Sequence, residues 1–258
     1  MLSGRVVLIT GASSGIGRAC ATYFARAGAK ILLCARRLDV LNELAAELKA
    51  NYKAEVYAFK LDVRHHAEIQ TALRSLPSPW QPIDILINNA GLALGLDFIQ
   101  DGEIEDWETM VDTNIKGVMY MTHEILPQMV ARNSGHIINL GSIAGHEVYP
   151  RGGIYCATKH AVHAFSIGLR MDLLGTKIRV STVSPGAVKT DFSVVRFKGD
   201  VKRAEDAFAG LDALSADDIA DAILYCASRP EHVNVNEIVI MPTAQASVGL
   251  VYRKSSQD

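Results

Sequence analysis

The stretch that most constrains the fold is an apolar run followed by a glycine-rich turn, VVLITGASSGIG, beginning at Val6. Val6–Ile9 is apolar and mostly β-branched with no polar alternation, which predicts a strand buried on both faces of a parallel sheet. Gly11, Gly15 and Gly17 carry no Cβ, so the backbone can turn tightly and approach a bound group closely. The following helix points its positive N-terminus at this turn, which favours an anion such as a pyrophosphate.

The spacing of these glycines, Gly-x-x-x-Gly-x-Gly, differs from the general dinucleotide fingerprint Gly-x-Gly-x-x-Gly. A β-to-α turn whose glycines serve packing alone is therefore an open alternative. Residues farther along the chain decide between the two.

Composition and charge narrow the function classes. The chain has 258 residues, 49% of them hydrophobic, so it can bury a large core. The net charge is -2 without a long basic run, which argues against nucleic acid or an anionic membrane surface as the main partner. No window has the apolar length of a membrane span, and residues 1–3 leave no room for a signal peptide. We expect a cytoplasmic soluble protein with a small-molecule partner.

Cysteine and histidine spacing predicts no metal site. The cysteines lie far apart without a Cys-x-x-Cys pair, as small core residues do: Cys20, Cys34, Cys156 and Cys226. The eight histidines show no metal-binding spacing, and His160 and His163 are expected to be packing or surface residues. Neither zinc nor disulfides are indicated.

Strands and helices alternate along the chain. The expected strands are Val6–Ile9, Lys30–Cys34, Val56–Leu61, Ile83–Ile87, His136–Leu140, Ile178–Val183 and Glu237–Met241. The expected helices are Ile16–Ala27, Leu38–Leu48, Ala67–Leu76, Glu105–Val130 with a bend or break near Pro127, Ile154–Leu174 and Ser215–Ser228. This order predicts a single α/β domain over residues 1–258, with a doubly wound, mostly parallel, seven-stranded sheet covered by helices on both faces.

Two segments depart from the alternation. The polar, weakly periodic stretch 189–214 is the best candidate for a mobile substrate lid. Residues 242–258 are expected to form a C-terminal tail.

The end of the second strand indicates which dinucleotide would bind. An NAD site normally carries an acidic residue about 20 residues after the glycines, where it binds the ribose hydroxyls. Arg36 and Arg37 stand at that place here. The planar guanidinium fork suits a phosphate, so the pair favours the 2′-phosphate of NADP. The alternative is that both arginines are exposed residues opening the next helix.

The ends of the third and fourth strands carry further candidates. Asp62 could accept a hydrogen bond from an adenine amino group, or it could cap the helix that follows, toward His65 and Glu68. Asn88–Gly91 lies where the strand order of a doubly wound sheet reverses and opens the crevice for dinucleotides.

Tyr155 and Lys159 are four residues apart at the start of a predicted helix, so their polar ends share one face. A free phenol titrates near pH ~10, and an adjacent ammonium lowers that pKa toward neutral pH. Ser142 follows a strand and could donate a hydrogen bond to an oxygen that becomes an alkoxide. The pair alone can arise by chance, but its combination with Ser142 and the phosphate turn predicts a catalytic site.

Together these motifs resemble those of the short-chain dehydrogenases/reductases, and the resemblance covers nearly the whole chain. The motifs are TGASSGIG from Thr10, NNAG from Asn88, Ser142, YCATK from Tyr155 and Pro185-Gly186. The resemblance implies a Rossmann fold and explains the glycine spacing. It implies that Tyr155 is the acid/base, that Ser142 orients the substrate, and that Lys159 holds the nicotinamide ribose. It also implies that Asn114 supports a proton relay through water.

The same resemblance implies a full set of residues for the cofactor. The expected NADP contacts are Gly11, Ser13, Ser14, Gly15, Ile16, Gly17, Arg36, Arg37, Asp62, Val63, Asn89, Ala90, Gly91, Tyr155, Lys159, Pro185, Gly186, Val188 and Thr190. Relatives are generally tetramers, and the apolar stretch Val162–Leu169 is compatible with a homotetramer.

Four further blocks are similar to the NADP-dependent 3-hydroxy acid dehydrogenases that oxidise serine, L-allo-threonine or 3-hydroxyisobutyrate. They begin at Asp106, Gly135, Phe192 and Met241. The resemblance implies a small, anionic substrate. The alternatives are a reductase of bulkier ketones or aldehydes or of sulfonated aldehydes, and a non-catalytic dinucleotide-binding regulatory protein, which would typically have lost Ser142, Tyr155 or Lys159.

Two arginines compete for the anionic group of the substrate. Arg196 lies in the irregular segment after Pro185-Gly186 and in a block shared with the 3-hydroxy acid dehydrogenases, so we favour it. Arg151 stands four residues before Tyr155, where relatives tend to have glycine. Either arginine could also be a solvated surface charge.

Overall fold

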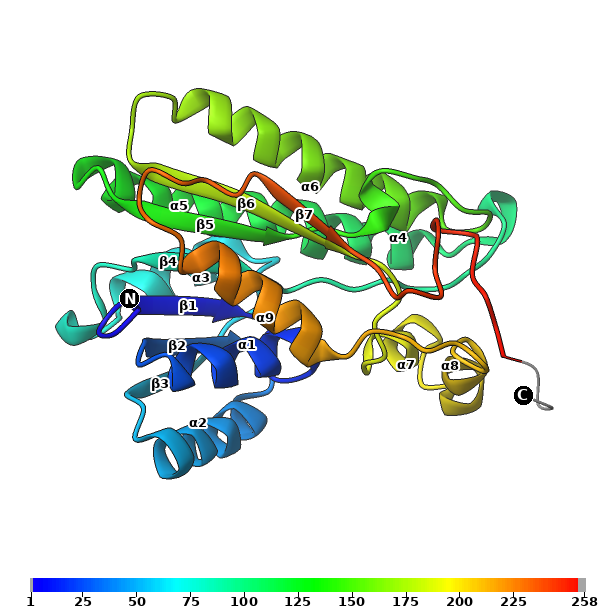
Figure 1. The fold of residues 1–258 in the computed structure, drawn as a ribbon, viewed down its shortest axis with the longest axis horizontal. Coiled ribbons are helices and arrows are strands. Elements are labelled where there is room, and N and C mark those ends of the chain that lie inside the picture. Colours follow the sequence, from blue (N-terminus) through cyan, green and yellow to red (C-terminus); the bar gives the residue numbers. More distant parts are fainter. Residues whose placement is uncertain (1, 255–258) are drawn as a thin grey trace.

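A seven-stranded sheet forms the centre of the computed structural model, which describes residues 2–254. Its strands run in the order β3-β2-β1-β4-β5-β6-β7, and each pairs in parallel with its neighbours (Figure 1). The sheet is thus parallel throughout, where the sequence predicted a mostly parallel one. The strands are β1 Val6–Thr10, β2 Lys30–Ala35, β3 Val56–Lys60, β4 Ile85–Asn88, β5 Gly135–Leu140, β6 Ile178–Pro185 and β7 Glu237–Ile240.

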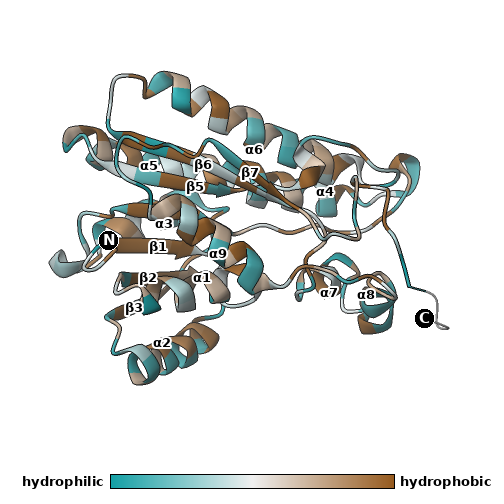
Figure 2. Cartoon of the chain, in the orientation of Figure 1, coloured by the Kyte–Doolittle hydropathy of each residue, from teal (hydrophilic) through white to brown (hydrophobic). Residues whose placement is uncertain are grey.

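Helices cover both faces of the sheet. The α-helices are α1 Gly15–Arg26, α2 Leu38–Tyr52, α3 His66–Arg74, α4 Ile104–Val111, α5 Gly117–Ala131, α6 Gly153–Asp172, α7 Phe192–Arg196, α8 Val201–Asp206 and α9 Ala216–Ala227. Buried residues of α1, α2 and α9 pack on one face, and those of α3, α5 and α6 on the other. In Figure 2 the strands are mostly brown and the helices alternate in colour, as expected when each helix turns one apolar stripe inward.

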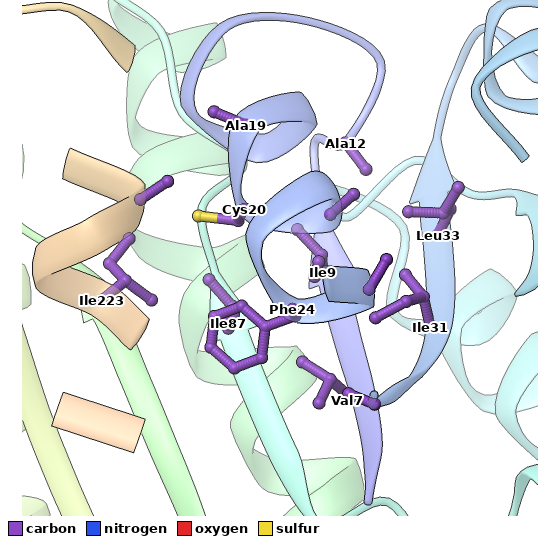
Figure 3. Packing of buried hydrophobic residues seen from close by; sticks show 14 of the residues in the cluster. Val7, Ile9, Ala12, Ala19, Cys20, Phe24, Ile31, Leu33, Ile87 and Ile223 are labelled. Atoms are coloured by element: carbon purple, nitrogen blue, oxygen red, sulfur yellow. The ribbon is translucent and has the colours of Figure 1, made fainter. Parts of the chain in front are cut away.

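The first βαβ unit is the best packed part of the nucleotide-binding half. Phe24 and Cys20 of α1 lie over Ile9 of β1 and face Ile223 of α9 (Figure 3). Each of these four side chains is fully buried. The helix ends at Ala27 and is followed by Gly28 at φ +80°, a left-handed position that glycine adopts without strain. This packing fixes the direction in which the N-terminus of α1 points.

The predicted long helix Glu105–Val130 is divided in two. The segment η3, Asp112–Lys116, has π-helical geometry and joins α4 to α5. Pro127 lies inside α5 and does not end the helix. Its side chain is exposed to solvent. The predicted break at Pro127 is therefore wrong, and the irregularity falls farther upstream, at Asn114 and its neighbours.

The segment 189–214 is more regular than predicted, since it contains α7 and α8 separated by a turn. The four cysteines are free and buried, as their spacing predicted. Among residues 2–254, no helix has both the length and the apolar content needed to cross a membrane.

Candidate active site

A cavity of about 620 Å³ lies at the carboxyl ends of the strands, beside β1 and β4, where the strand order reverses. Nearly all the residues predicted to bind a dinucleotide line it, together with the predicted catalytic Ser142: Gly11, Ser13, Ser14, Gly15, Ile16, Arg36, Arg37, Asp62, Val63, Asn89, Ala90, Gly91, Tyr155, Lys159, Pro185, Gly186, Val188 and Thr190. Gly17 is buried behind the lining instead. The topology thus gathers residues from six strand ends into one crevice.

The glycine turn forms a cradle that a side chain would fill. A Cβ on Gly11 would come within 2.9 Å of the Ala90 Cα, and a Cβ on Gly17 within 2.5 Å of the Asn89 Nδ2. Gly15 has φ +52°, a conformation that other residues adopt only with strain. The first turn of α1 carries no acidic residue, so its backbone N–H groups face the cavity without a competing charge. These features fit the diphosphate of a dinucleotide.

A threonine that the sequence analysis did not select joins the two halves of the crevice. The Thr10 Oγ1 accepts hydrogen bonds from the backbone N–H groups of Asn89, at 3.0 Å, and Ala90, at 2.9 Å. In return the Asn89 Nδ2 donates to the Thr10 carbonyl at 2.8 Å. The side chain of Asn89 therefore positions the turn as well as lining the cavity.

The two arginines after β2 lie at the end of the cavity formed by β2 and β3. Arg36 and Arg37 are exposed and both line the crevice. The Arg37 Nη2 donates to the Ser13 Oγ at 3.0 Å, which brings its guanidinium next to the glycine turn. No acidic residue stands at this strand end, so the local charge suits a phosphate on the ribose.

Asp62 does not cap the helix that follows. Its carboxylate accepts from the Arg64 Nη2 at 2.6 Å and from the Arg64 backbone N–H at 3.1 Å, while α3 begins at His66 with His65 as its N-cap. Burial acts to raise the pKa of Asp62, but hydrogen bonds and the charge of Arg64 outweigh it and lower that pKa. The capping alternative is therefore wrong, and Arg64 becomes a further cation on the cavity wall.

Lys159 is a buried lysine held at the floor of the crevice. Its Nζ donates to the Leu140 carbonyl at 2.8 Å, and burial lowers its pKa to about 8. The Nζ lies 5.9 Å from the centroid of the Tyr155 ring. Ser142 is buried as well, and its Oγ accepts from the Ala144 N–H at 3.1 Å as it caps the short helix η4, Ile143–Gly145.

The cation nearest the Tyr155 ring is Arg196, whose Cζ lies 5.0 Å from the ring centroid. Burial raises the pKa of Tyr155 above its ordinary value, and Arg196, followed by the Ser142 hydroxyl, counteracts this rise. The sequence analysis expected Lys159 to lower this pKa. In the structure Arg196 is a further cation beside this ring, while the Lys159 ammonium, 5.9 Å from the ring centroid, donates to the Leu140 carbonyl.

Asn114 lies in η3, and its side chain forms hydrogen bonds with the loop that follows β4. Its Nδ2 donates to the Leu92 carbonyl at 2.7 Å and to the Thr158 Oγ1 at 3.0 Å, while its Oδ1 accepts from the Leu92 N–H at 2.9 Å. Asn114 is buried and does not line the large cavity. Its Oδ1 and the Lys159 Nζ both lie close to Gly91: a Cβ on Gly91 would lie 3.3 Å from the first and 3.6 Å from the second.

Tyr155 also borders a second, smaller hollow that both candidate substrate arginines line. Its free volume is about 20 Å³, the room of a single water-sized molecule. The Arg196 guanidinium occupies this side of the site, against the rings of both Tyr155 and Phe192, and its Nη2 donates to the Tyr149 hydroxyl at 2.8 Å. Arg151 is exposed and lies over the ring of Phe98 at 4.3 Å.

The segment that carries Arg196 is fastened over this hollow at two points. The Gly95 N–H donates to the Arg196 carbonyl at 2.9 Å, and the Lys198 Nζ forms an ion pair with the Asp106 Oδ2 at 2.7 Å. Both partners lie on the opposite side of the crevice, in the loop after β4 and in α4. The 189–214 segment is thus closed on the site.

Sequence reasoning missed several residues of the site. Tyr149 and Phe192 complete the aromatic surroundings of Arg196, and Arg64 and Thr113 line the large cavity. Tyr149 stands two residues before Arg151 in a stretch already examined for the substrate, so its position was a usable signal. Arg64 had no motif to mark it.

Comparison with known proteins identifies the class to which this fold and site belong. Residues 5–200 match the family model described as short chain dehydrogenase. The NADP-dependent 3-hydroxy acid dehydrogenase of Escherichia coli (strain K12) is 47% identical over 246 residues, covering 95% of this chain and 98% of that protein. The enzyme of the same name from Schizosaccharomyces pombe is 44% identical over 256 residues, covering 99% of each chain.

Two solved structures are similar in fold and sequence. The closed form of serine dehydrogenase complexed with NADP+ matches with a TM-score of 0.91 and 46% identity, covering 96% of this chain and 99% of that one. Serine dehydrogenase from Escherichia coli matches with a TM-score of 0.81 and 43% identity, covering 93% and 99%. The chain belongs to the short-chain dehydrogenase family, and it is an oxidoreductase that acts on CH–OH groups.

Proposed function

We propose that this chain is an NADP-dependent dehydrogenase that interconverts a small 3-hydroxy acid, such as serine, L-allo-threonine or 3-hydroxyisobutyrate, with its oxo acid. The observation that carries the proposal is the Arg196 guanidinium beside Tyr155, a residue that also lines the large cavity. A cation next to the acid/base selects a substrate with an anionic group. The names of the relatives and of the solved serine dehydrogenases support the same substrate class.

The residues of the crevice fit NADP. The glycine cradle would hold the diphosphate at the N-terminus of α1, and Arg36 and Arg37 would hold the 2′-phosphate. Asn89, Tyr155, Lys159, Pro185 and Gly186 would surround the nicotinamide half. When bound, NADP accepts the hydride from the carbinol carbon or returns it to the carbonyl.

The protein's own chemistry is proton transfer at the substrate oxygen. In the oxidation direction the Tyr155 oxygen takes the proton of the substrate hydroxyl as a general base, and in reduction it gives that proton back. The Ser142 hydroxyl, fixed by its η4 cap, holds the same substrate oxygen. Lys159 would bind the nicotinamide ribose, and Asn114 would hold the water that links this group to solvent.

Arg196 is placed to bind the substrate carboxylate. It lies against two aromatic rings and, among the described residues, its side chain donates one hydrogen bond, to Tyr149, which leaves several of its N–H donors for a ligand. Its Nε is buried and has no hydrogen-bond partner among the described residues, as expected when a group from the substrate completes the site. Likeness to a form described as closed supports 189–214 as the lid that carries this arginine.

The test is a panel of substrates followed by nicotinamide absorbance with each cofactor. It contains small 3-hydroxy acids, their esters, sulfonated and plain aldehydes, and bulky ketones. We expect the highest kcat/KM with the small acids and NADP. Higher kcat/KM with bulky ketones or sulfonated aldehydes would move the protein to another branch of the family, and an absence of turnover throughout would favour a regulatory role.

We also propose a homotetramer in the cytoplasm. Met171 and Leu174 at the end of α6, 70% and 89% exposed, give that helix apolar surface for a second copy. Four free, buried thiols suit a reducing compartment. Light scattering after size-exclusion chromatography measures the assembly, and a monomer or dimer at micromolar concentration would contradict it.

A further inference from the structure

We propose that His146, His163 and Glu237 form a site for a zinc ion, outside the crevice and independent of the proposed reaction. One ligand atom from each residue lies within 4.8 Å of the other two. Two imidazole nitrogens and a carboxylate oxygen are a donor set that Zn²⁺ prefers, with water as a fourth ligand. The sequence predicted no metal site and treated His163 as a packing or surface residue.

The distances between donors are close to those of a tetrahedral zinc site. The His146 Nε2 is 2.8 Å and the His163 Nδ1 is 3.3 Å from the Glu237 Oε1. Ligands about 2.0–2.1 Å from zinc lie about 3.3 Å from one another in a tetrahedron. The two imidazole rings meet edge to face, with centroids 4.5 Å apart and an angle of 77° between their planes. Small rotations of these side chains would bring all three donors onto one ion.

A second observation supports the zinc site: one polar atom of the cluster, the His163 Nδ1, lacks a hydrogen-bond partner among the described residues. The Glu237 Oε1 accepts from the Ser184 Oγ at 2.9 Å and lies 2.8 Å from the His146 Nε2. The His163 Nδ1 is buried and has no hydrogen-bond partner among residues 2–254, although it lies 3.3 Å from the same oxygen. Such an orphaned nitrogen is rare in the interior of a protein. An ion between the three side chains would satisfy it.

The cluster opens to solvent on one side. Each of the three side chains keeps about a quarter of its surface exposed, with 25% for each histidine and 23% for Glu237. Water can therefore reach a bound ion and complete its coordination. The Ser184 hydroxyl, already hydrogen bonded to Glu237, would orient the carboxylate as an outer partner.

A bound ion would join three elements around the catalytic residues. His146 follows directly on η4, the short helix that Ser142 caps. His163 lies one turn beyond Lys159 on α6, and Glu237 begins β7 at the edge of the sheet. None of the three lines the large cavity, so the site would stabilise this edge of the fold without contacting substrate.

The experiment uses the full-length protein after treatment with a chelator. Titration calorimetry with ZnCl₂ measures the affinity and the stoichiometry, and thermal unfolding with and without Zn²⁺ measures the stabilisation, with MgCl₂ as the comparison ion. We expect one tight zinc ion per chain and a higher Tm with Zn²⁺ but not with Mg²⁺. Both readouts are independent of catalytic activity.

Variants assign the ligands. His163→Ala and Glu237→Gln should weaken zinc binding by more than about 100-fold and abolish the Tm increase, because loss of even an outer-shell partner costs about 10- to 100-fold. His160→Ala is the matched control, since His160 is on the same helix and its Nδ1 is within hydrogen-bond distance of the Cys156 carbonyl.

Two outcomes would overturn the proposal. One is that the unaltered protein binds no zinc more tightly than magnesium. The other is that His163→Ala, with a folded circular dichroism spectrum, binds zinc as tightly as the His160→Ala control. Because Glu237 also holds Ser184 and His146, its variant is interpreted together with His163→Ala, whose side chain makes no hydrogen bond that the fold would lose.

Discussion

The guanidinium of Arg196 lies over the ring of Tyr155 at 5.0 Å, closer than the ammonium of Lys159 at 5.9 Å. One arginine thus faces both the proposed acid/base and the hollow for the substrate. Its charge has two effects: it counteracts the rise that burial causes in the pKa of Tyr155, and it offers N–H donors to an anion. These two effects can be measured separately.

The first prediction concerns substrate charge. Loss of a charge-assisted contact costs about 1.5–3 kcal/mol, so Arg196→Met should reduce the preference for a 3-hydroxy acid over its methyl ester by about 10- to 100-fold. Arg151→Met is the control, because Arg151 is exposed over Phe98 and should change that ratio little. Steady-state kcat/KM values for both compounds give the answer. An unchanged ratio in Arg196→Met would transfer the role to Arg151 or to a substrate without an anion.

A second prediction concerns the proton. Tyr155→Phe should lower kcat by about 10²- to 10⁴-fold, the usual contribution of general acid–base catalysis, while the affinity for NADPH stays nearly unchanged. In the unaltered enzyme, kcat/KM for oxidation of the ester should rise with pH as Tyr155 ionises. Arg196→Met should move that rise to higher pH, because Arg196 lowers the pKa of Tyr155. A Tyr155→Phe protein with normal turnover would refute the assignment.

The cofactor preference gives a third prediction. Arg36→Ala or Arg37→Ala should reduce the ratio of kcat/KM with NADP to that with NAD by about 10- to 100-fold, since each removes a charge-assisted phosphate contact. Arg26→Ala, at the far end of α1, is the control and should leave the ratio unchanged. Equal efficiency with both cofactors before any substitution would contradict the prediction.

The fourth prediction is a pH dependence of stability. Burial lowers the pKa of Lys159 from 10.5 to about 8, so below pH 8 the folded state bears the full cost of holding a buried charge. Between these two pKa values the folded state loses the proton while the unfolded state keeps it. The free energy of unfolding therefore gains from this group as pH rises, by up to about 1.4 kcal/mol per pH unit.

Urea unfolding at pH 7–9.5 measures this gain as the difference between the unaltered protein and Lys159→Met. Over that range the free energy of unfolding of the unaltered protein should rise by about 2 kcal/mol relative to that of Lys159→Met. Lys60→Met, which removes an exposed lysine at the end of β3, is the control and should show no such trend. A flat difference for Lys159→Met would mean that the ammonium is solvated in the folded state.

Local patterns predicted most of the fold. The apolar runs located all seven strands within one or two residues, and the helix expected from Ser215 forms as α9, with Ser215 and Asp218 as its capping box. Motifs located the crevice equally well, because residues at the ends of parallel strands necessarily share one edge of the sheet. The π-helical segment η3 was missed, since its residues have an ordinary helical pattern and its geometry depends on the contacts of Asn114.

Contacts that no sequence pattern marks account for the parts of the site that sequence reasoning could not find. Arg64 turns back onto Asp62 two residues away, and nothing in the pattern separates this ion pair from a helix cap. Arg196 lies nearer than Lys159 to the centroid of the Tyr155 ring, and this depends on how the segment 189–214 packs over the crevice. His146, His163 and Glu237 come from separate elements that meet only when β7 pairs with β6.

The π-helical segment Asp112–Lys116 makes the length of the chain at this point as important as its composition. A π-helical turn holds one residue more than an α-helical turn, because its hydrogen bonds join residues five apart. Deleting one residue from this segment would leave an ordinary α-helical turn and would move Asn114 away from Leu92 and Thr158. Gly117 is packed so closely that a Cβ there would come within 2.7 Å of the Val63 side chain, which leaves no slack to absorb the change. This stretch is thus constrained in residue number as well as in the identity of Asn114.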